Sequence, residues 1–182
     1  MLEVRFHGRG GQGTVVACEI LAKTLFYEGK YVQYFPEFGV ERRGAPVRAF
    51  LRVSDEKIYL RHQIYEPDYV IVLDPSLGIE NVISGLKSGG WLIVNSPRVP
   101  SEFKAVGPFK IASIDGNRIA LKHRIGTEAA PIVNTVILGA IAKVLEFSFA
   151  SLAQAIQEKF GKDRRNLLAA QEAYEKVKLG EE

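Results

Sequence analysis

Apolar and polar positions along the chain follow two different periods, and each period predicts a different element. Leu2, Val4 and Phe6 alternate with charged residues, which is typical of a strand with one buried face. Residues 69–74 and 91–95 are short, almost wholly apolar runs of the kind that is buried on both faces of a parallel sheet. We predict further strands at residues 30–35, 47–53, 57–60 and 110–115, with 47–53 and 57–60 joined as a hairpin by the turn Ser54-Asp55.

Helical periodicity follows the first strand and dominates the last third of the chain. Apolar residues recur at spacings of three and four over residues 14–27, where Gly29 ends the pattern. The same spacing predicts helices over residues 131–145, 149–160 and 163–177, with Asp163 as a candidate N-cap. Two shorter helices are expected at residues 79–86 and 117–124.

This order of elements predicts a three-layer α/β/α sandwich with a mostly parallel, mixed sheet of the Rossmann-like type. The first strand, the helix over residues 14–27 and the strand at 30–35 form a βαβ unit. We found no internal repeat and no clear linker, so residues 1–182 are expected to form a single domain.

Composition narrows the function. The chain has 24 Lys and Arg against 21 Asp and Glu, a net charge of +3, which does not indicate a nucleic-acid-binding protein. No apolar run approaches the length that spans a bilayer, and no signal peptide is apparent. The single cysteine, Cys18, excludes a disulfide framework and a cysteine-ligated cluster within this chain. We therefore expect a cytoplasmic protein, with Cys18 as a residue of the core.

A glycine-rich turn lies between the first strand and the first helix. Its glycines allow a tight turn and a close approach to an anion, while the helix N-terminus favours negative charge. The alternative is that the glycines serve only the turn; we favour anion binding, with Arg9 adding a cation. The candidate residues are Gly8, Arg9, Gly10, Gly11, Gln12 and Gly13.

The spacing of this turn also fits a dinucleotide-binding fingerprint. A nicotinamide site needs an acidic residue at the end of the second strand. Glu37 lies beyond Pro36, which makes a ribose contact doubtful. A Walker-type loop is excluded because no Gly-Lys-Ser/Thr follows the turn.

Charged and apolar residues gather in the segment from Phe35 to Arg52. One interpretation is a solvated loop with weak surface ion pairs; the other is a basic patch for an anionic ligand or a partner subunit. We favour a contact surface, because aromatic side chains beside arginines are typical of interfaces. The candidate residues are Phe38, Glu41, Arg42, Arg43 and Arg48, with Arg52 at strand spacing from Arg48.

Gly8, Asp74 and Asn95 follow or end predicted parallel strands, so we expect them at one edge of the sheet. For Asp74 we favour a capping role in the turn that follows. The three histidines show no metal-ligand spacing, and the chain shows no self-sufficient catalytic constellation.

Several motifs in order make the chain similar to a known family. It resembles the gamma subunit of 2-oxoacid:ferredoxin oxidoreductases of the pyruvate synthase type over nearly its whole length. The resemblance rests on five segments: the glycine turn, Phe38–Gly44, Glu66-Pro67-Asp68, Leu86–Gly90 and Asn134–Ala140. Two positions depart from the family pattern: Phe38 replaces its tyrosine, and Ala45 replaces its second glycine.

The resemblance implies a subunit that is not catalytic alone. Such an enzyme oxidatively decarboxylates a 2-oxoacid with coenzyme A and passes electrons to ferredoxin. Thiamine diphosphate, magnesium and 4Fe-4S clusters would belong to companion alpha, beta and delta-type subunits, with no cofactor bound by this chain alone. The glycine turn and Arg9 would be candidates for a phosphate of coenzyme A, and Glu41, Arg42 and Arg43 for the subunit contact or the access channel.

Three alternatives stay open. The complex could act on another 2-oxoacid, such as 2-oxoisovalerate, 2-oxoglutarate or indolepyruvate. The chain could be a freestanding dinucleotide-binding enzyme, or an interaction module whose glycine turn is purely structural.

Overall fold

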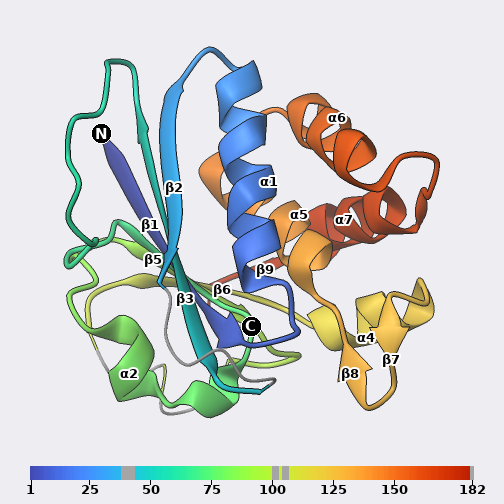
Figure 1. Ribbon diagram of the computed structural model, residues 1–182. Coiled ribbons are helices and arrows are strands. Elements are labelled where there is room, and N and C mark those ends of the chain that lie inside the picture. The colour runs from blue at the N-terminus through green and yellow to red at the C-terminus, as the bar shows by residue number, and fades with distance from the viewer. Residues whose placement is uncertain (38–43, 100–102, 104–106, 181–182) are drawn as a thin grey trace.

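The computed structural model describes residues 1–37, 44–99, 103 and 107–180. A seven-stranded mixed sheet forms its centre, in the order β2-β3-β1-β4-β5-β6-β9 (Figure 1). The strands are β1 (Leu2–Arg9), β2 (Tyr31–Glu37), β3 (Pro46–Ser54), β4 (Tyr69–Val72), β5 (Trp91–Asn95), β6 (Lys110–Ile114) and β9 (Lys178–Leu179). Two further short strands, β7 (Gly126–Thr127) and β8 (Ala130–Pro131), form a separate ribbon.

Parallel pairing runs through the middle of the sheet and antiparallel pairing lies at both ends. The neighbours β1, β4, β5 and β6 are parallel, whereas β3 is antiparallel to both β1 and β2, and β9 is antiparallel to β6. The predicted α/β fold with a mixed sheet is therefore confirmed.

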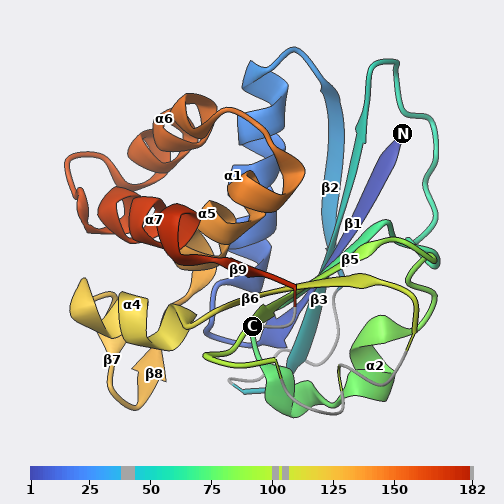
Figure 2. The same ribbon diagram turned by 180° about the vertical axis from the view of Figure 1, so that it is seen from behind.

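Helices cover the two faces of the sheet unequally. Figures 1 and 2 show α1, α5, α6 and α7 on one side and α2 on the other. Alternation along β4 explains the two cores: Ile71 faces the larger helical layer, whereas Val70 and Val72 pack with Val82 of α2. The helices are α1 (Thr14–Tyr27), η1 (Pro75–Leu77), α2 (Ile79–Ile83), α4 (Gly116–Lys122), α5 (Asn134–Leu145), α6 (Phe149–Phe160) and α7 (Arg165–Lys176).

The predicted hairpin of residues 47–53 with 57–60 is wrong. Residues 57–60 form no strand, and β3 instead lies between β1 and β2 and pairs with both. Five consecutive residues of β3, 49–53, are buried. The edge strand β2 has no buried residue, so the burial of residues 49–53 is typical of an inner strand and not of a hairpin at the edge.

Helices α5 and α7 approach each other closely within the larger core. A Cβ built on Gly139 would lie 1.9 Å from the backbone oxygen of Ala170. Nearby, the Thr135 hydroxyl donates to Asn166 Oδ1 at 2.9 Å, and both side chains are buried. Glycine at position 139 thus sets how near the two helix backbones can come.

Across the described residues, no helix combines the length and apolar character that crossing a membrane requires.

Candidate functional site

The carboxyl ends of the parallel strands meet at one edge of the sheet, as predicted for Gly8, Asp74 and Asn95. The Asn95 side chain donates from Nδ2 to the Leu73 carbonyl at 2.8 Å and accepts from the Gly116 amide at 2.9 Å. A Cβ on Gly8 would lie 3.3 Å from Leu73 Cβ. Asn95, at the end of β5, therefore links the residue that follows β4 to the start of α4, and the glycine turn lies beside Leu73.

Steric contacts explain the glycines of the turn. A Cβ on Gly8 would lie only 2.1 Å from Thr14 Oγ1, and one on Gly13 would lie 2.7 Å from Asn134 Nδ2. Gly11 and Gly13 also have φ angles of 95° and 81°, in the left-handed region that favours glycine. The turn thus requires these glycines on conformational and packing grounds, whether or not a ligand binds.

Backbone and side-chain bonds hold the turn against its neighbours. The Gly10 amide donates to the Ala45 carbonyl at 2.8 Å, and the Gly44 amide donates to the Gly10 carbonyl at 3.0 Å. Gln12 Oε1 accepts from the Arg9 amide at 2.8 Å. The turn is consequently joined to the chain that leads into β3.

Arg9 and Asp74 form the centre of this arrangement. Arg9 Nε lies 3.2 Å from Asp74 Oδ2, while its Nη1 donates to the Gly44 carbonyl at 3.1 Å and its Nη2 to Ser76 Oγ at 2.9 Å. Gln12 Nε2 also donates to Asp74 Oδ2 at 2.8 Å. Arg9 is therefore held in place by groups of the same chain, and an anion would meet it already oriented.

Asp74 itself has the capping role that we favoured. Its Oδ1 accepts from both the amide and the hydroxyl of Ser76, at 3.0 and 2.6 Å. Burial raises the pKa of the Asp74 carboxyl, but the hydrogen bonds from Ser76 and Gln12 outweigh burial, and with Arg9 they lower it. The carboxylate is therefore ionised at neutral pH and fully occupied in the turn.

The amino end of α1 remains open to a ligand. Gly13 occupies the N-cap position without a side-chain hydrogen bond, and the first turn contains no acidic residue. In the described part of the chain, the amides of Gly11 and Gly13 have no hydrogen-bond acceptor. Such free amides at a helix N-terminus suit an anion, so anion binding stays a prediction.

The topology argues against a nicotinamide site. In a dinucleotide-binding fold the strand that carries the ribose-binding acid lies beside the first strand. Here β3 separates β2 from β1. Glu37, at the end of β2, pairs with Arg48 of β3, with Arg48 Nη2 donating to Glu37 Oε1 at 2.7 Å.

The predicted contact surface is only partly described. Phe38, Glu41, Arg42 and Arg43 lie outside the described residues, whereas Arg48 lies on β3 with its side chain 44% exposed. Arg52 does not belong to an open basic patch: it is 0% exposed and pairs with Glu3 at 2.8 Å. The strand-spacing interpretation placed both arginines on one face correctly but overlooked this internal partner.

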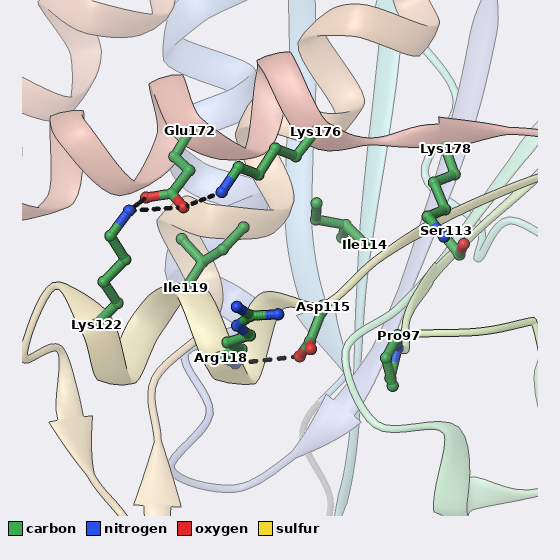
Figure 3. A pocket seen from close by; sticks show the side chains of 10 residues that line it. All are labelled: Pro97, Ser113, Ile114, Asp115, Arg118, Ile119, Lys122, Glu172, Lys176 and Lys178. Atoms are coloured by element: carbon green, nitrogen blue, oxygen red, sulfur yellow. Dashed lines mark hydrogen bonds and ion pairs between the residues drawn. The ribbon is translucent and has the colours of Figure 1, made fainter.

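A second group of basic residues was not predicted. A cavity of about 360 Å³ lies beside α4, α7 and β9. Figure 3 shows Arg118 and Lys178 among the side chains that line it. Glu172 of α7 binds Lys122 at 2.8 Å, Lys176 at 2.7 Å and His123 at 2.7 Å. Lys122 and His123 lie 50 and 49 positions before Glu172 in sequence, so no local motif indicates their assembly.

The described residues contain no group of three or more His, Cys, Asp or Glu that could hold a metal ion. Cys18 is buried as predicted, and burial raises the pKa of its thiol.

Comparisons with known proteins agree with this architecture. A family model described as pyruvate ferredoxin/flavodoxin oxidoreductase matches residues 3–176. The chain is 52% identical over 182 residues to a protein of Methanothermobacter marburgensis named pyruvate synthase subunit PorC, with 98% of each chain covered. It is 50% identical over 184 residues to a protein of Thermococcus litoralis named pyruvate/ketoisovalerate oxidoreductases common subunit gamma, with 97% of each covered. Among solved structures, the pyruvate oxidoreductase subunit PORC of Thermotoga maritima is 36% identical and superimposes with a TM-score of 0.85, over 99% of this chain and 98% of that one.

Proposed function

The chain belongs to the pyruvate ferredoxin/flavodoxin oxidoreductase family as a gamma-type subunit, and from this premise we propose that its complex is a pyruvate:ferredoxin oxidoreductase. In that reaction pyruvate and coenzyme A give acetyl-CoA, carbon dioxide and a proton. The two electrons released by decarboxylation reduce two one-electron ferredoxin centres.

The iron–sulfur clusters of this reaction do not fit the present chain. A cluster of the 4Fe-4S type needs four ligands, normally thiolates, whereas the chain has one cysteine and that cysteine is buried. We therefore assign the clusters to companion alpha, beta and delta-type subunits, and from the resemblance to the family we assign thiamine diphosphate with magnesium to them as well. Reduced ferredoxin requires a reducing compartment, which makes the cytoplasm the proposed location.

Residues 1–182 are proposed to act as one domain that shapes the complex and contributes to the coenzyme A site. The observation that carries this role is the open amino end of α1, where the Gly11 and Gly13 amides lack acceptors in the described part of the chain. Arg9, oriented by Asp74, adds a fixed positive charge beside it. Phe38, Glu41, Arg42, Arg43 and Arg48 are proposed for the subunit contact or the channel.

The residues that select the 2-oxoacid are proposed to lie on the companion subunits. The Thermococcus litoralis relative is named as a subunit common to pyruvate and ketoisovalerate oxidoreductases. A gamma subunit shared in this way leaves the choice of substrate to its companions, and 2-oxoisovalerate is accordingly the second candidate.

Purification of the native complex through a tag on this chain tests the assignment. We expect larger subunits with thiamine diphosphate and iron–sulfur to co-elute, and ferredoxin reduction to require pyruvate and coenzyme A together. A homo-oligomer that carries a nucleotide would contradict the proposal.

Separate Arg9→Ala and Arg43→Ala variants of the complex test the ligand role. We expect the KM for coenzyme A to rise while the KM for pyruvate stays unchanged. Asp74→Asn is the matched control for Arg9, because it weakens the anchor and keeps the guanidinium. An unchanged KM for coenzyme A in both arginine variants would refute a coenzyme A contact and leave the subunit assignment intact.

A further inference from the structure

A cavity of about 460 Å³ lies on the α2 face of the sheet, beside the last residues of β1. Its polar lining comes from His7, Glu37, Arg48 and Asn81, and apolar side chains form the rest of the wall. Val4 and Phe6 of β1 face the helical core on the other side of the sheet. The cavity is therefore separated from the helix that follows the glycine turn by the sheet itself.

His7 presents a fixed donor to this cavity. Its side chain is buried, with 4% of the residue exposed, and Arg5 Nε donates to His7 Nε2 at 2.9 Å. Since a guanidinium only donates, Nε2 must be the unprotonated nitrogen, and the neutral ring carries its proton on Nδ1. The bond from Arg5 is the one side-chain hydrogen bond of His7 among the described residues, and it leaves Nδ1 without a partner there. Burial and the nearby Arg5 and Arg48 lower the pKa of His7 to about 3, which keeps the ring neutral.

Arg5 is a buried cation that lacks a carboxylate partner within the described residues. Besides His7, its guanidinium donates to the backbone carbonyls of Val82 at 3.0 Å and Ser84 at 2.5 Å. Burial and Arg48 lower the pKa of Arg5 to about 10, so it stays charged at neutral pH. A buried charge without a counterion is unfavourable and favours an anion nearby.

Arg48 supplies a second donor. Its Nη2 donates to Glu37 Oε1 at 2.7 Å, and its Nε forms an ion pair with Glu37 Oε2. Its Nη1 has no partner among the described residues. Among the described residues near the cavity, two guanidiniums and one carboxylate, with His7 neutral, sum to one positive charge. Asn81 is uncharged, and its amide nitrogen donates to the Leu77 carbonyl at 2.8 Å.

We infer that this cavity binds the carboxylate of a short-chain aliphatic acid. One carboxylate oxygen would accept from His7 Nδ1–H and the other from Arg48 Nη1–H, and the single negative charge would balance the cluster. The alkyl chain would pack on Leu77 and Val82. Glu37 disfavours a dianion such as phosphate, because it places a like charge beside Arg48. The inference does not depend on the reaction of the complex.

Calorimetric titration of the full chain with sodium butyrate at constant ionic strength tests the site. We expect saturable binding of one butyrate, no binding of butan-1-ol, and weaker binding of inorganic phosphate. Binding of phosphate that equals or exceeds that of butyrate, or no saturable binding of butyrate, would overturn the inference.

Two substitutions at the mouth of the cavity should act in opposite directions. Arg48→Gln should weaken butyrate binding at least tenfold, whereas Glu37→Gln should tighten it severalfold by freeing Arg48. Arg61→Gln, which removes an exposed arginine elsewhere, is the matched control and should have no effect. Equal affinities for the wild type and Arg48→Gln, or weaker binding by Glu37→Gln, would contradict the site.

Long-range proton–nitrogen NMR gives a reading that a purely structural histidine would not. We expect the Nδ1–H tautomer of His7 in the free chain and a shift of its Nδ1 resonance on adding butyrate. An Nε2–H tautomer, or a Nδ1 resonance that butyrate does not move, would refute the proposed donor.

Discussion

Replacing Gly139 by alanine separates two physical effects that have opposite signs. Intrinsic helix propensity favours alanine over glycine by about 1 kcal/mol, so propensity alone predicts a more stable protein. Packing predicts the reverse, because the new Cβ would lie 1.9 Å from the Ala170 backbone oxygen and 2.7 Å from its carbonyl carbon. Backbone atoms cannot rotate away, so α5 and α7 must move apart by about 1 Å, as overpacked cores do.

The size of the effect follows from these contacts. Overpacking of a core costs about 3 kcal/mol at the upper end of its usual range, and the separation also strains the buried bond from Thr135 to Asn166. After the propensity gain of about 1 kcal/mol, the free energy of unfolding should fall by about 2 kcal/mol. For a chain of this length, Tm should fall by roughly 4–8 °C.

Thermal and urea unfolding of the full chain, followed by circular dichroism, measure this change. Ala153→Gly in α6 is the control for propensity alone and should lose about 1 kcal/mol. A Gly139→Ala variant with an unchanged or higher Tm would show that the α5–α7 distance is not limited by this glycine, and the packing argument would be wrong.

Three further outcomes are expected. Burial would raise the pKa of Glu172, but hydrogen bonds from two lysines and His123 outweigh burial and lower the pKa from 4.5 to about 2. Glu172→Gln should therefore lower the free energy of unfolding by about 2 kcal/mol at pH 7. Urea unfolding should show this difference disappearing as the pH falls from 4.5 to 2. Cys18 should not react with a thiol reagent in the native chain and should react once in urea, because burial raises the pKa of its thiol; rapid native labelling would contradict its place in the core. Asn95→Ala leaves the Gly116 amide and the Leu73 carbonyl without their partner and should destabilise the chain by about 2 kcal/mol in the same urea assay; a wild-type midpoint would refute the joining role of Asn95.

Periodicity predicted the elements well where neighbouring residues determine them. Residues 91–95 and 149–160 form the expected strand and helix, because burial on the sheet or on one helix face repeats along the chain. The hairpin failed for a different reason. The turn at Ser54-Asp55 is a local signal, whereas β3 pairs with β1 and β2, which precede it in the chain, and residues 49–53 are buried in that position.

The part of the candidate site that could be predicted from the sequence is the part set by the direction of the strands. Parallel strands end at a common edge, which placed Gly8, Asp74 and Asn95 together. The partners of Arg9 were not foreseeable, since Asp74 and Ser76 are more than 60 residues away in sequence. The hydrogen bond from Arg5 to the Val82 carbonyl of α2 was likewise not foreseeable, because the two residues are 77 positions apart in sequence.

The division of the larger core between the two ends of the chain affects how the protein is made. All four parallel strands precede residue 115, but the helices α5 and α7 that complete their cover begin at residues 134 and 165. A chain still on the ribosome therefore exposes Ile71, Ile93 and Ala112 on an unfinished sheet, a surface prone to aggregation. Burial of that surface in the larger core therefore requires α5 and α7, which are synthesised after every parallel strand of the sheet.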